Sequence, residues 1–268
     1  MLASIPSPPF NTIPIGPLEI HFYGLLIGIG AILAVVIGLN RYTDDPDERQ
    51  EVERILVRAI VIGFAGARLA YVSTHLGRFE GEWWKVIAIW EGGLALFGGL
   101  TAGTLTAVWM IRRRNGDQWK LLDAAAVGIP VAQAIGRWGN YFNQELFGTP
   151  SNLPWAVEID QRFRPEAYAD AATFHPTFLY ESLWNIAIVV PALLWTERRF
   201  DLPRGGLFFV YAGLYGVGRF GLELIRTDTT FRLLGLSRNG WVSLLIVTGA
   251  VVAFALRRRG SARVESDS

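Results

Sequence analysis

The chain has 268 residues, of which 51% are hydrophobic and only 18% are charged, and its formal net charge is +1. This composition favours a protein whose solvent is largely lipid. The near-zero charge gives no reason to expect nucleic-acid binding, and the absence of cysteine excludes disulfides, thiolate metal sites and a cysteine nucleophile from this chain.

Long apolar stretches recur along the chain, each near the ~20 residues that a helix needs to cross a bilayer. They predict about seven transmembrane helices, and therefore an all-α membrane protein. The stretches are 19–40, 55–75, 86–111, 120–141, 174–196, 205–226 and 240–256.

Arginine and lysine gather in alternate connections between these stretches, which predicts the orientation because short cytoplasmic loops collect basic residues. The basic segments carry Arg41, Arg49 and Arg54, then Arg112, Arg113, Arg114 and Lys120, then Arg198, Arg199 and Arg204, and finally Arg257, Arg258, Arg259 and Arg263. The N-terminus is therefore expected outside and the C-terminus inside. Residues 1–20 lack the basic start of a cleaved signal peptide and are expected to form an external segment.

No internal repeat or long linker divides the sequence, so residues 1–268 are expected to form a single integral membrane domain. The longest external connection, 144–173, is long enough for a small external head with short elements, for which "PWAVEID" is a candidate strand. Two spans are expected to be irregular, because 91–103 is rich in glycine and 124–136 contains Pro130. Such backbone is tolerated at membrane depth only where it is buried in protein or lines a wet cavity.

Four arginines lie within or at the outer ends of predicted spans, where orientation does not explain them: Arg68, Arg137, Arg219 and Arg226. An arginine inside a membrane costs several kcal/mol unless a partner compensates it. One explanation is structural ion pairing with Glu91, Glu181 or Glu223. The other is a polar cavity that binds an anion.

The sixth predicted span, "YGVGRFGLELIR", places Tyr215, Arg219, Glu223 and Arg226 within one arc of roughly 80° on a helix. This polar stripe must face the interior of the bundle. Glu223 and Arg226 are three residues apart and could pair structurally, so Arg219 is the better candidate for a ligand contact.

The stretch "GRWGNYFNQELFG", residues 136–148, puts Arg137 and Asn140 on one helical face. A planar guanidinium matches phosphate oxygens in a bidentate fork, and asparagine amides hydrogen-bond ester or hydroxyl groups. The stretch therefore predicts a phosphate-binding corner at the outer interface.

Further polar residues gather on the same side of the predicted bundle. His21 and Tyr23 begin the first span, and His175, Tyr180 and Glu181 begin the fifth. They are either interfacial anchors or part of the same site.

These motifs resemble those of the bacterial prolipoprotein diacylglyceryl transferases. "GRWGNYFNQELFG" is similar to the most specific signature of that family. Further matching blocks lie before and after it, in the order found in the family, and together they cover most of the chain. They are "HFYG" at 21–24, "GARLAY" at 66–71, "IWEGGLALFGGL" at 89–100, "HPTFLYE" at 175–181 and "YGVGRFGLELIR" at 215–226.

The resemblance implies a multi-pass enzyme of the bacterial plasma (inner) membrane. Such an enzyme transfers the diacylglyceryl group of phosphatidylglycerol to the lipobox cysteine in the signal peptide of a preprolipoprotein, and releases glycerol phosphate. The peptide supplies the thiol nucleophile, which agrees with a chain that has no cysteine. No metal, other cofactor or nucleic-acid partner is expected.

The resemblance and the polar neighbourhood together assign expected roles. Arg137 and Arg219 match two essential arginines of the family, and with Tyr23 and Glu145 they are the expected catalytic residues. The residues expected to bind substrate are Arg137, Asn140, Asn143, Gly148, His21, Glu223, Arg226, Tyr215 and His175.

One position departs from the family pattern. Phe97 stands where many members have a histidine that has been proposed as the base for the thiol, and Phe97 cannot accept a proton. We expect the base elsewhere, at His21, His175 or Glu145; otherwise the protein would be an altered member that acts as an envelope scaffold. The remaining alternative is a transporter of lipid or small anions, because intramembrane arginines also line translocation paths, although no inverted repeat is visible.

Overall fold

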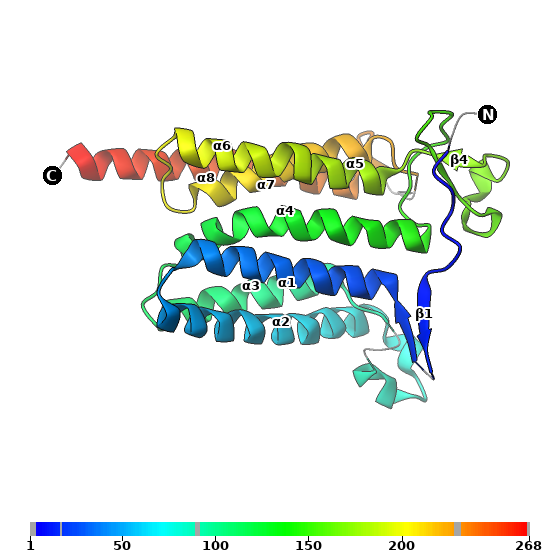
Figure 1. The fold of residues 1–268 in the computed structure, drawn as a ribbon, viewed down its shortest axis with the longest axis horizontal. Coiled ribbons are helices and arrows are strands. Elements are labelled where there is room, and N and C mark those ends of the chain that lie inside the picture. The colour runs from blue at the N-terminus through cyan, green and yellow to red at the C-terminus, as the bar shows by residue number, and fades with distance from the viewer. Residues whose placement is uncertain (1–3, 17, 89–91, 228–231, 267–268) are drawn as a thin grey trace. The chain divides into compact units, whose positions relative to one another are not determined.

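The computed structural model describes residues 4–16, 18–88, 92–227 and 232–266, and most of them are helical. The chain divides into two compact units, a larger one of Met1–Gly38 with Leu122–Ser268 and a smaller one of Leu39–Leu121. The α-helices in Figure 1 are α1 (Phe22–Tyr42), α2 (Pro46–Thr74), α3 (Leu96–Arg113), α4 (Gln118–Asn143), α5 (Thr177–Leu183), α6 (Val190–Arg199), α7 (Gly206–Glu223) and α8 (Arg238–Ser266). A π-helical segment, η6 (Trp184–Val189), joins α5 to α6.

Among the described residues, four helical segments are long and apolar enough to cross a membrane: Phe22–Tyr42, Pro46–Thr74, Thr177–Arg199 and Arg238–Arg259. Large apolar side chains point outward on them, and Leu69 and Leu245 are 71% and 69% exposed. A side chain of this kind is stable on the outside of a helix when lipid surrounds it. The chain is therefore a mostly helical membrane protein. The other three predicted spans overlap α3, α4 and α7, although α3 begins only at Leu96 and not near residue 86. The count of seven crossings stays a prediction.

The two spans expected to be irregular differ from each other. Residues 92–95, immediately before α3, are not helical, and Gly92 and Gly93 have φ of 83° and 75°, which glycine adopts without strain. By contrast, α4 continues as one helix through Pro130, contrary to the expected irregularity. Close packing explains the continuity, because a Cβ on Gly128 would lie 2.7 Å from the Ala34 carbonyl oxygen of α1, and neighbouring helices support a proline-containing helix.

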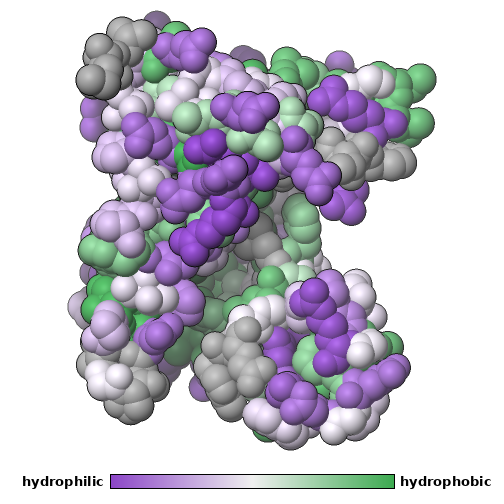
Figure 2. Space-filling model, turned by 90° about the vertical axis from the view of Figure 1, so that its right-hand side faces the viewer, coloured by the Kyte–Doolittle hydropathy of each residue, from purple (hydrophilic) through white to green (hydrophobic). Residues whose placement is uncertain are grey.

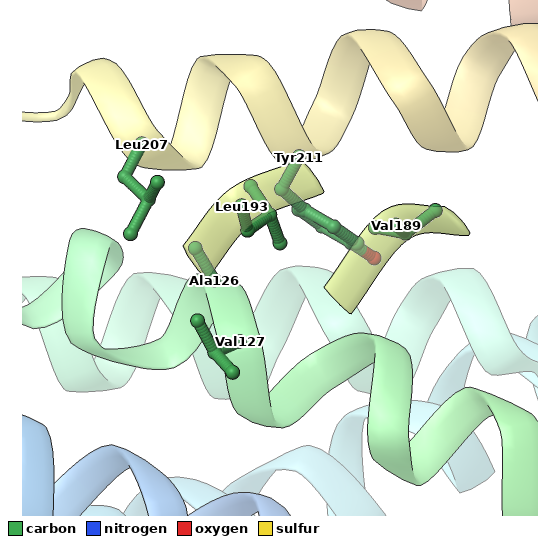
Figure 3. Close-up of a cluster of buried hydrophobic side chains, with 6 residues drawn as sticks. All are labelled: Ala126, Val127, Val189, Leu193, Leu207 and Tyr211. Carbon is green, nitrogen blue, oxygen red and sulfur yellow. The ribbon is translucent and has the colours of Figure 1, made fainter. Parts of the chain in front are cut away.

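The core of the larger unit lies where α4, η6, α6 and α7 meet, as Figure 3 shows. Its buried side chains are Ala126 and Val127 from α4, Val189 from η6, Leu193 from α6, and Leu207 and Tyr211 from α7. Apolar side chains of adjacent helices thus pack in one layer. This layer fixes α4, α5–α6 and α7 against one another.

Asp123 joins α4 to the start of α7. Its two carboxylate oxygens accept hydrogen bonds from the backbone N–H groups of Gly205, at 2.7 Å, and Phe208, at 3.0 Å. These donors belong to the helix N-terminus, where a carboxylate is stabilising. The capped end of α7 is the end opposite Arg219.

Three short antiparallel hairpins complete the described fold. They are β1 (Thr12–Ile15) with β2 (Leu18–His21), β3 (Val157–Glu158) with β4 (Thr173–Phe174), and β5 (Arg232–Leu233) with β6 (Leu236–Ser237). β3 lies within the segment proposed as a strand from "PWAVEID". Single turns η4 (Gln161–Phe163) and η5 (Glu166–Tyr168) lie between β3 and β4. Figure 2 shows the side of the structure on which β1 and β4 are labelled in Figure 1, and many of the residues visible on it are hydrophilic.

The segment between α4 and α5 is tied to the end of α4 through Gln144. The Gln144 side chain donates from Nε2 to Asp160 Oδ2 and accepts from the Asp160 backbone N–H at Oε1, both at 2.8 Å. Ser7 donates to the other Asp160 oxygen at 2.9 Å. Hydrogen bonds from Gln144 and Ser7 lower the pKa of the Asp160 carboxyl, so it is charged at neutral pH. This linkage fixes the chain immediately after Asn143.

In the smaller unit, α2 and α3 pack through glycine. A Cβ on Gly98 would lie 2.7 Å from the Gly66 carbonyl oxygen, and one on Gly99 would lie 3.2 Å from that of Gly63. Small residues of this kind allow two helix backbones to approach closely, as membrane helices often do. Two 3₁₀ turns, η1 (Leu76–Phe79) and η2 (Trp83–Ile87), lie between α2 and α3.

Candidate functional site

Five charged side chains form a row in the larger unit, in which arginine and glutamate alternate; four come from the helices α4, α5 and α7, and the fifth follows the end of α7. Arg137 of α4 is 2.6 Å from Glu181 of α5, measured from Nη2 to Oε1, and Arg219 Nη1 of α7 is 4.0 Å from Glu181 Oε2. Arg219 Nη2 is 2.9 Å from Glu223 Oε2, and Arg226 Nε is 4.0 Å from the same oxygen. The residues Arg137, Glu181, Arg219, Glu223 and Arg226 are hereafter the charged row. Three of the four unexplained intramembrane arginines thus belong to one cluster.

Burial makes the charged row sensitive to its own charge balance. The Glu181 and Glu223 side chains are 6% and 3% exposed, Arg219 is 12% exposed, and Arg137 is the most accessible at 22%. Removing one partner from a buried ion pair leaves an uncompensated charge and costs about 3–5 kcal/mol. Ion pairing with Glu181 and Glu223, one of the two explanations considered above, is therefore present. Ion pairing does not exclude anion binding, because Arg137 is still partly accessible.

The predicted pair of Glu223 with Arg226 is not the closest contact in the row. Glu223 lies nearer to Arg219, one turn earlier on α7, and its other oxygen accepts a hydrogen bond from Ser237 at 2.7 Å. A separation of four residues brings side chains together on a helix as well as three does, and α7 ends at Glu223, so that Arg226 lies beyond the helix. Glu223 therefore holds Arg219 as well as approaching Arg226.

Asn140 extends the charged row toward Glu145. Arg137 Nη1 donates to Asn140 Oδ1 at 3.4 Å, and Asn140 Nδ2 donates to Glu145 Oε1 at 2.8 Å. Asn143 donates to the same Glu145 oxygen at 3.2 Å. Four predicted site residues from "GRWGNYFNQELFG" are thus joined through one hydrogen-bonded chain.

The turn after α4 explains how Glu145 folds back. Gln144 and Leu146 on either side of it have positive φ, 50° and 56°, and the Glu145 N–H donates to the Asn140 carbonyl at 3.1 Å. Positive φ is uncommon outside glycine and needs support from the surroundings. That support comes from the Gln144–Asp160 pair and from Thr177, whose hydroxyl donates to the Leu146 carbonyl.

Gly148 links this turn to the two other segments that carry predicted residues. Its N–H donates to the His175 carbonyl at 2.9 Å, and it forms an antiparallel bridge with Arg226. A Cβ at Gly148 would lie 2.8 Å from His175 Cβ and 2.9 Å from the Ile225 carbonyl oxygen. Only glycine fits here without displacing backbone, so Gly148 positions the segments and offers no side chain for chemistry.

His175 belongs to a second hydrogen-bonded group. Its Nδ1 is 3.1 Å from the Tyr180 hydroxyl, and that hydroxyl accepts from Trp155 Nε1 at 3.0 Å. Tyr180 precedes Glu181 on α5. His175 therefore contacts the residue that directly precedes Glu181, a member of the charged row.

The remaining predicted residues differ in their relation to the charged row. Tyr23 packs against Gly139 of α4, where an added Cβ would collide with the Tyr23 ring, and it interacts electrostatically with Glu145 and Arg137. Tyr215 lies one turn before Arg219 on α7. His21 is exposed and pairs with Thr12 across the β1–β2 hairpin, and within the described parts of the chain it forms no hydrogen bond or ion pair with the charged row.

Arg68 lies in the smaller unit and is held by backbone carbonyls. Its guanidinium donates to the Val86 carbonyl at 2.8 Å and the Gly93 carbonyl at 3.0 Å, and also to the Lys85 and Gly92 carbonyls. It therefore fastens the non-helical segment before α3. Glu91, considered above as an ion-pair partner, lies outside the described residues.

The sequence patterns underrated two residues of the site. From the sequence, Glu181 is a possible ion-pair partner and one of the polar residues that begin the fifth span, without an assigned role, and no role is expected for Ser237. An acidic residue within the apolar stretch "FLYESLW" is a signal for the first. Nothing local marks Ser237, which reaches Glu223 only through tertiary folding.

The fold and the charged row define a helical membrane protein with a buried polar centre among α4, α5 and α7. The sequence profile of the prolipoprotein diacylglyceryl transferases matches residues 11–256, and the chain belongs to this family.

Curated relatives are similar in sequence to this protein over nearly the whole chain. Phosphatidylglycerol–prolipoprotein diacylglyceryl transferase 2 of Streptomyces coelicolor is 40% identical over 95% of this chain and 81% of its own length. The phosphatidylglycerol–prolipoprotein diacylglyceryl transferase of Cutibacterium acnes is 41% identical over 96% of this chain and 87% of its own length. The phosphatidylglycerol–prolipoprotein diacylglyceryl transferase of Frankia alni is 43% identical over 97% of this chain and 69% of its own length.

Proposed function

We propose that this protein transfers the diacylglyceryl group of phosphatidylglycerol to the lipobox cysteine thiol of preprolipoproteins. The family and the names of its relatives support the two substrates. The observation that carries the proposal is that guanidinium groups from two helices, Arg137 of α4 and Arg219 of α7, converge on one carboxylate, Glu181. A pair of cations so placed suits an anion with several oxygens, such as a phosphodiester.

The reaction is a displacement at a glycerol carbon. The thiolate sulfur attacks this carbon, a carbon–sulfur bond forms, and the carbon–oxygen bond to phosphate breaks with its electron pair leaving on glycerol phosphate. Arg137 and Arg219 stabilise the negative charge that develops on the leaving phosphate. A preorganised donor of this kind is worth ~2.7–4 kcal/mol in other enzymes.

The thiol must first lose its proton, because the thiolate is the nucleophile and a free cysteine has a pKa of ~8.5. Within this site, His175 and Glu145 are the proposed acceptors. His175 has a ring nitrogen in contact with Tyr180, and Glu145 is exposed while it accepts hydrogen bonds from two asparagines. Asn140, Asn143 and Tyr23 then position lipid ester or hydroxyl groups beside Arg137.

The test of this function uses purified protein, vesicles that contain phosphatidylglycerol, and a peptide with a lipobox cysteine. Formation of a thioether-linked diacylglyceryl peptide in step with release of glycerol phosphate is expected. The same peptide with serine in place of cysteine is the control, because it keeps the sequence and loses the thiol. Lipid or anion movement between compartments without modified peptide would support a transporter instead.

The proposed topology is a multi-pass protein of the plasma membrane with seven crossings, the N-terminus outside and the 144–173 head external. A reporter fused after Arg259 is expected to be cytoplasmic and one inserted near Asn152 external, because the basic residues lie in alternate connections. Protease or thiol-labelling accessibility of each reporter measures this. Finding both reporters on one side of the membrane contradicts the model of seven crossings.

A substitution at Phe97 tests whether the base that accepts the thiol proton lies elsewhere in the chain. Phe97 lies on α3 of the smaller unit and is 71% exposed. Replacing Phe97 with histidine is expected to change the transfer rate by less than about tenfold, or ~1.4 kcal/mol, because His175 and Glu145 remain. Transfer assays of both proteins measure it. An inactive native protein that Phe97→His activates would show that this chain has lost its base.

A further inference from the structure

Glu181 occupies the centre of the charged row in a way that resembles a bound anion. Its two carboxylate oxygens face different arginines, Oε1 toward Arg137 at 2.6 Å and Oε2 toward Arg219 at 4.0 Å. The contacts are nevertheless incomplete, because Glu181 Oε1 and Arg219 Nη1 are buried and neither has an aligned hydrogen-bond partner in the described structure. The position thus suits an oxyanion, but the carboxylate fills it imperfectly.

Asn185 lies four residues after Glu181, one turn along the same helical segment. It is 0% exposed, and neither Oδ1 nor Nδ2 has a hydrogen-bond partner in the described structure. A buried polar group without a partner costs about 1–3 kcal/mol, and such groups in a native protein call for a specific explanation. Asn185 also lies in η6, and π-helical segments occur frequently at functional sites. Packing alone therefore does not explain an asparagine at this position.

We propose that Glu181 is an internal counter-ion that holds Arg137 and Arg219 until the phosphate of the lipid displaces it, and that Asn185 then receives the displaced carboxylate. This inference rests on the proposed function, since it assigns the phosphate to the two arginines. It makes Asn185 a positioning residue, which donates from Nδ2 to Glu181 only in the lipid-bound state. Residues four apart on a helix are close enough for this contact.

The exchange keeps buried charge compensated at each stage. Without substrate, the two partly buried arginines need a nearby anion, because an uncompensated charge at low dielectric is costly. When the phosphate binds, it takes over this role, and the released carboxylate needs a donor of its own. Asn185 supplies a neutral donor, so that no further positive charge competes for the phosphate.

The first test replaces Glu181 with glutamine, which keeps the size of the side chain and removes its charge. Because the competing anion is gone, glycerol phosphate is expected to bind about tenfold or more tightly to Glu181→Gln. The ligand-free variant is expected to unfold at a lower temperature, and glycerol phosphate to raise that temperature more than it does in the native protein. Unchanged or weaker binding would mean that Glu181 is only a structural partner, and would overturn the proposal.

The second test replaces Asn185 with leucine and separates stability from binding. Removal of an unpartnered amide is expected to leave the ligand-free protein as stable as before or more stable. Glycerol phosphate is nevertheless expected to bind about tenfold more weakly, because the displaced carboxylate has lost its donor. In the double variant with Glu181→Gln this weakening is expected to vanish, since the two residues act through one contact.

Ser182→Ala is the matched control, since Ser182 is buried on the same helix three residues before Asn185 and is not expected to change binding. If Glu181→Gln does not fold, the Asn185→Leu protein decides alone. Equal binding by the native protein and Asn185→Leu then overturns the proposal. Neutral glycerol serves as the ligand control in each case.

These measurements need no transfer reaction, so the two proposals can fail separately. A native protein that modifies the peptide while Glu181→Gln binds glycerol phosphate no better would refute the counter-ion and leave the transferase. Tighter binding by Glu181→Gln in a protein that never modifies the peptide would refute the transferase and leave an anion site with an internal counter-ion.

Discussion

Replacing Arg137 with lysine is expected to lower the rate of diacylglyceryl transfer about a hundredfold or more, equivalent to ~2.7 kcal/mol, in a protein that still folds. Arg137 uses separate nitrogens for separate contacts, Nη2 for Glu181 and Nη1 for Asn140. Lysine keeps the positive charge and can retain an ion pair with Glu181, but it lacks the planar fork that holds two oxygens of a phosphate. Stability and activity are therefore expected to separate.

The measurement is turnover per folded molecule, with thermal unfolding in detergent recorded on the same preparation. Arg114→Lys is the control variant, because Arg114 forms an exposed ion pair with Glu51 at 2.6 Å, and such pairs contribute little. Near-native turnover in a stable Arg137→Lys protein would refute a phosphate-binding Arg137. A loss of stability that matches the loss of activity would favour a purely structural ion pair.

Replacing Gly148 with alanine is expected to be the second most damaging change, with a loss of transfer of about tenfold or more and a lower unfolding temperature. The added Cβ would approach His175 Cβ and the Ile225 carbonyl oxygen to within 2.8 and 2.9 Å, so one of these segments must move. Overpacking of this kind typically costs ~1–3 kcal/mol. The movement would alter the bridge from Gly148 to Arg226, and with it the end of the charged row.

Gly221→Ala provides the comparison, because a Cβ at Gly221 meets no atom within 4 Å. That variant is expected to keep both stability and transfer. Both properties are measured as for Arg137→Lys. Native-like transfer by Gly148→Ala would show that the close approach is not needed, and would leave Gly148 without a positioning role.

The sequence predicts those parts of this molecule that depend on local spacing. Each apolar stretch overlaps a helical segment, although α3 begins only at Leu96. Residues 137 and 140 come together because they are three apart on α4. The contact of Arg137 with Glu181 could not be predicted in this way. It joins α4 to α5, and only the packing of those helices decides which of several glutamates meets which arginine.

The two spans that were expected to be irregular also differ in how far local sequence decides their backbone. Gly92 and Gly93 lie in non-helical backbone before α3, as their conformational freedom suggests, since both adopt positive φ. Pro130 does not interrupt α4, because α1 packs closely beside it at Gly128. The sequence contains the breaking signal, but the neighbouring helix overrides it.

The cap that Asp123 makes on α7 has a mechanical consequence for a distant part of the protein. Asp123 lies 14 residues before Arg137, or ~21 Å along α4 at 1.5 Å per residue, and it fastens α4 to the start of the helix that carries Arg219. A tilt of only about 3° between α4 and α7 about this fastening would shift Arg137 by ~1 Å, and a misplacement of that size can slow a reaction about a hundredfold. The distance between the Arg137 and Arg219 guanidinium groups is thus sensitive to the hydrogen bonds that Asp123 makes at the opposite end of the two helices.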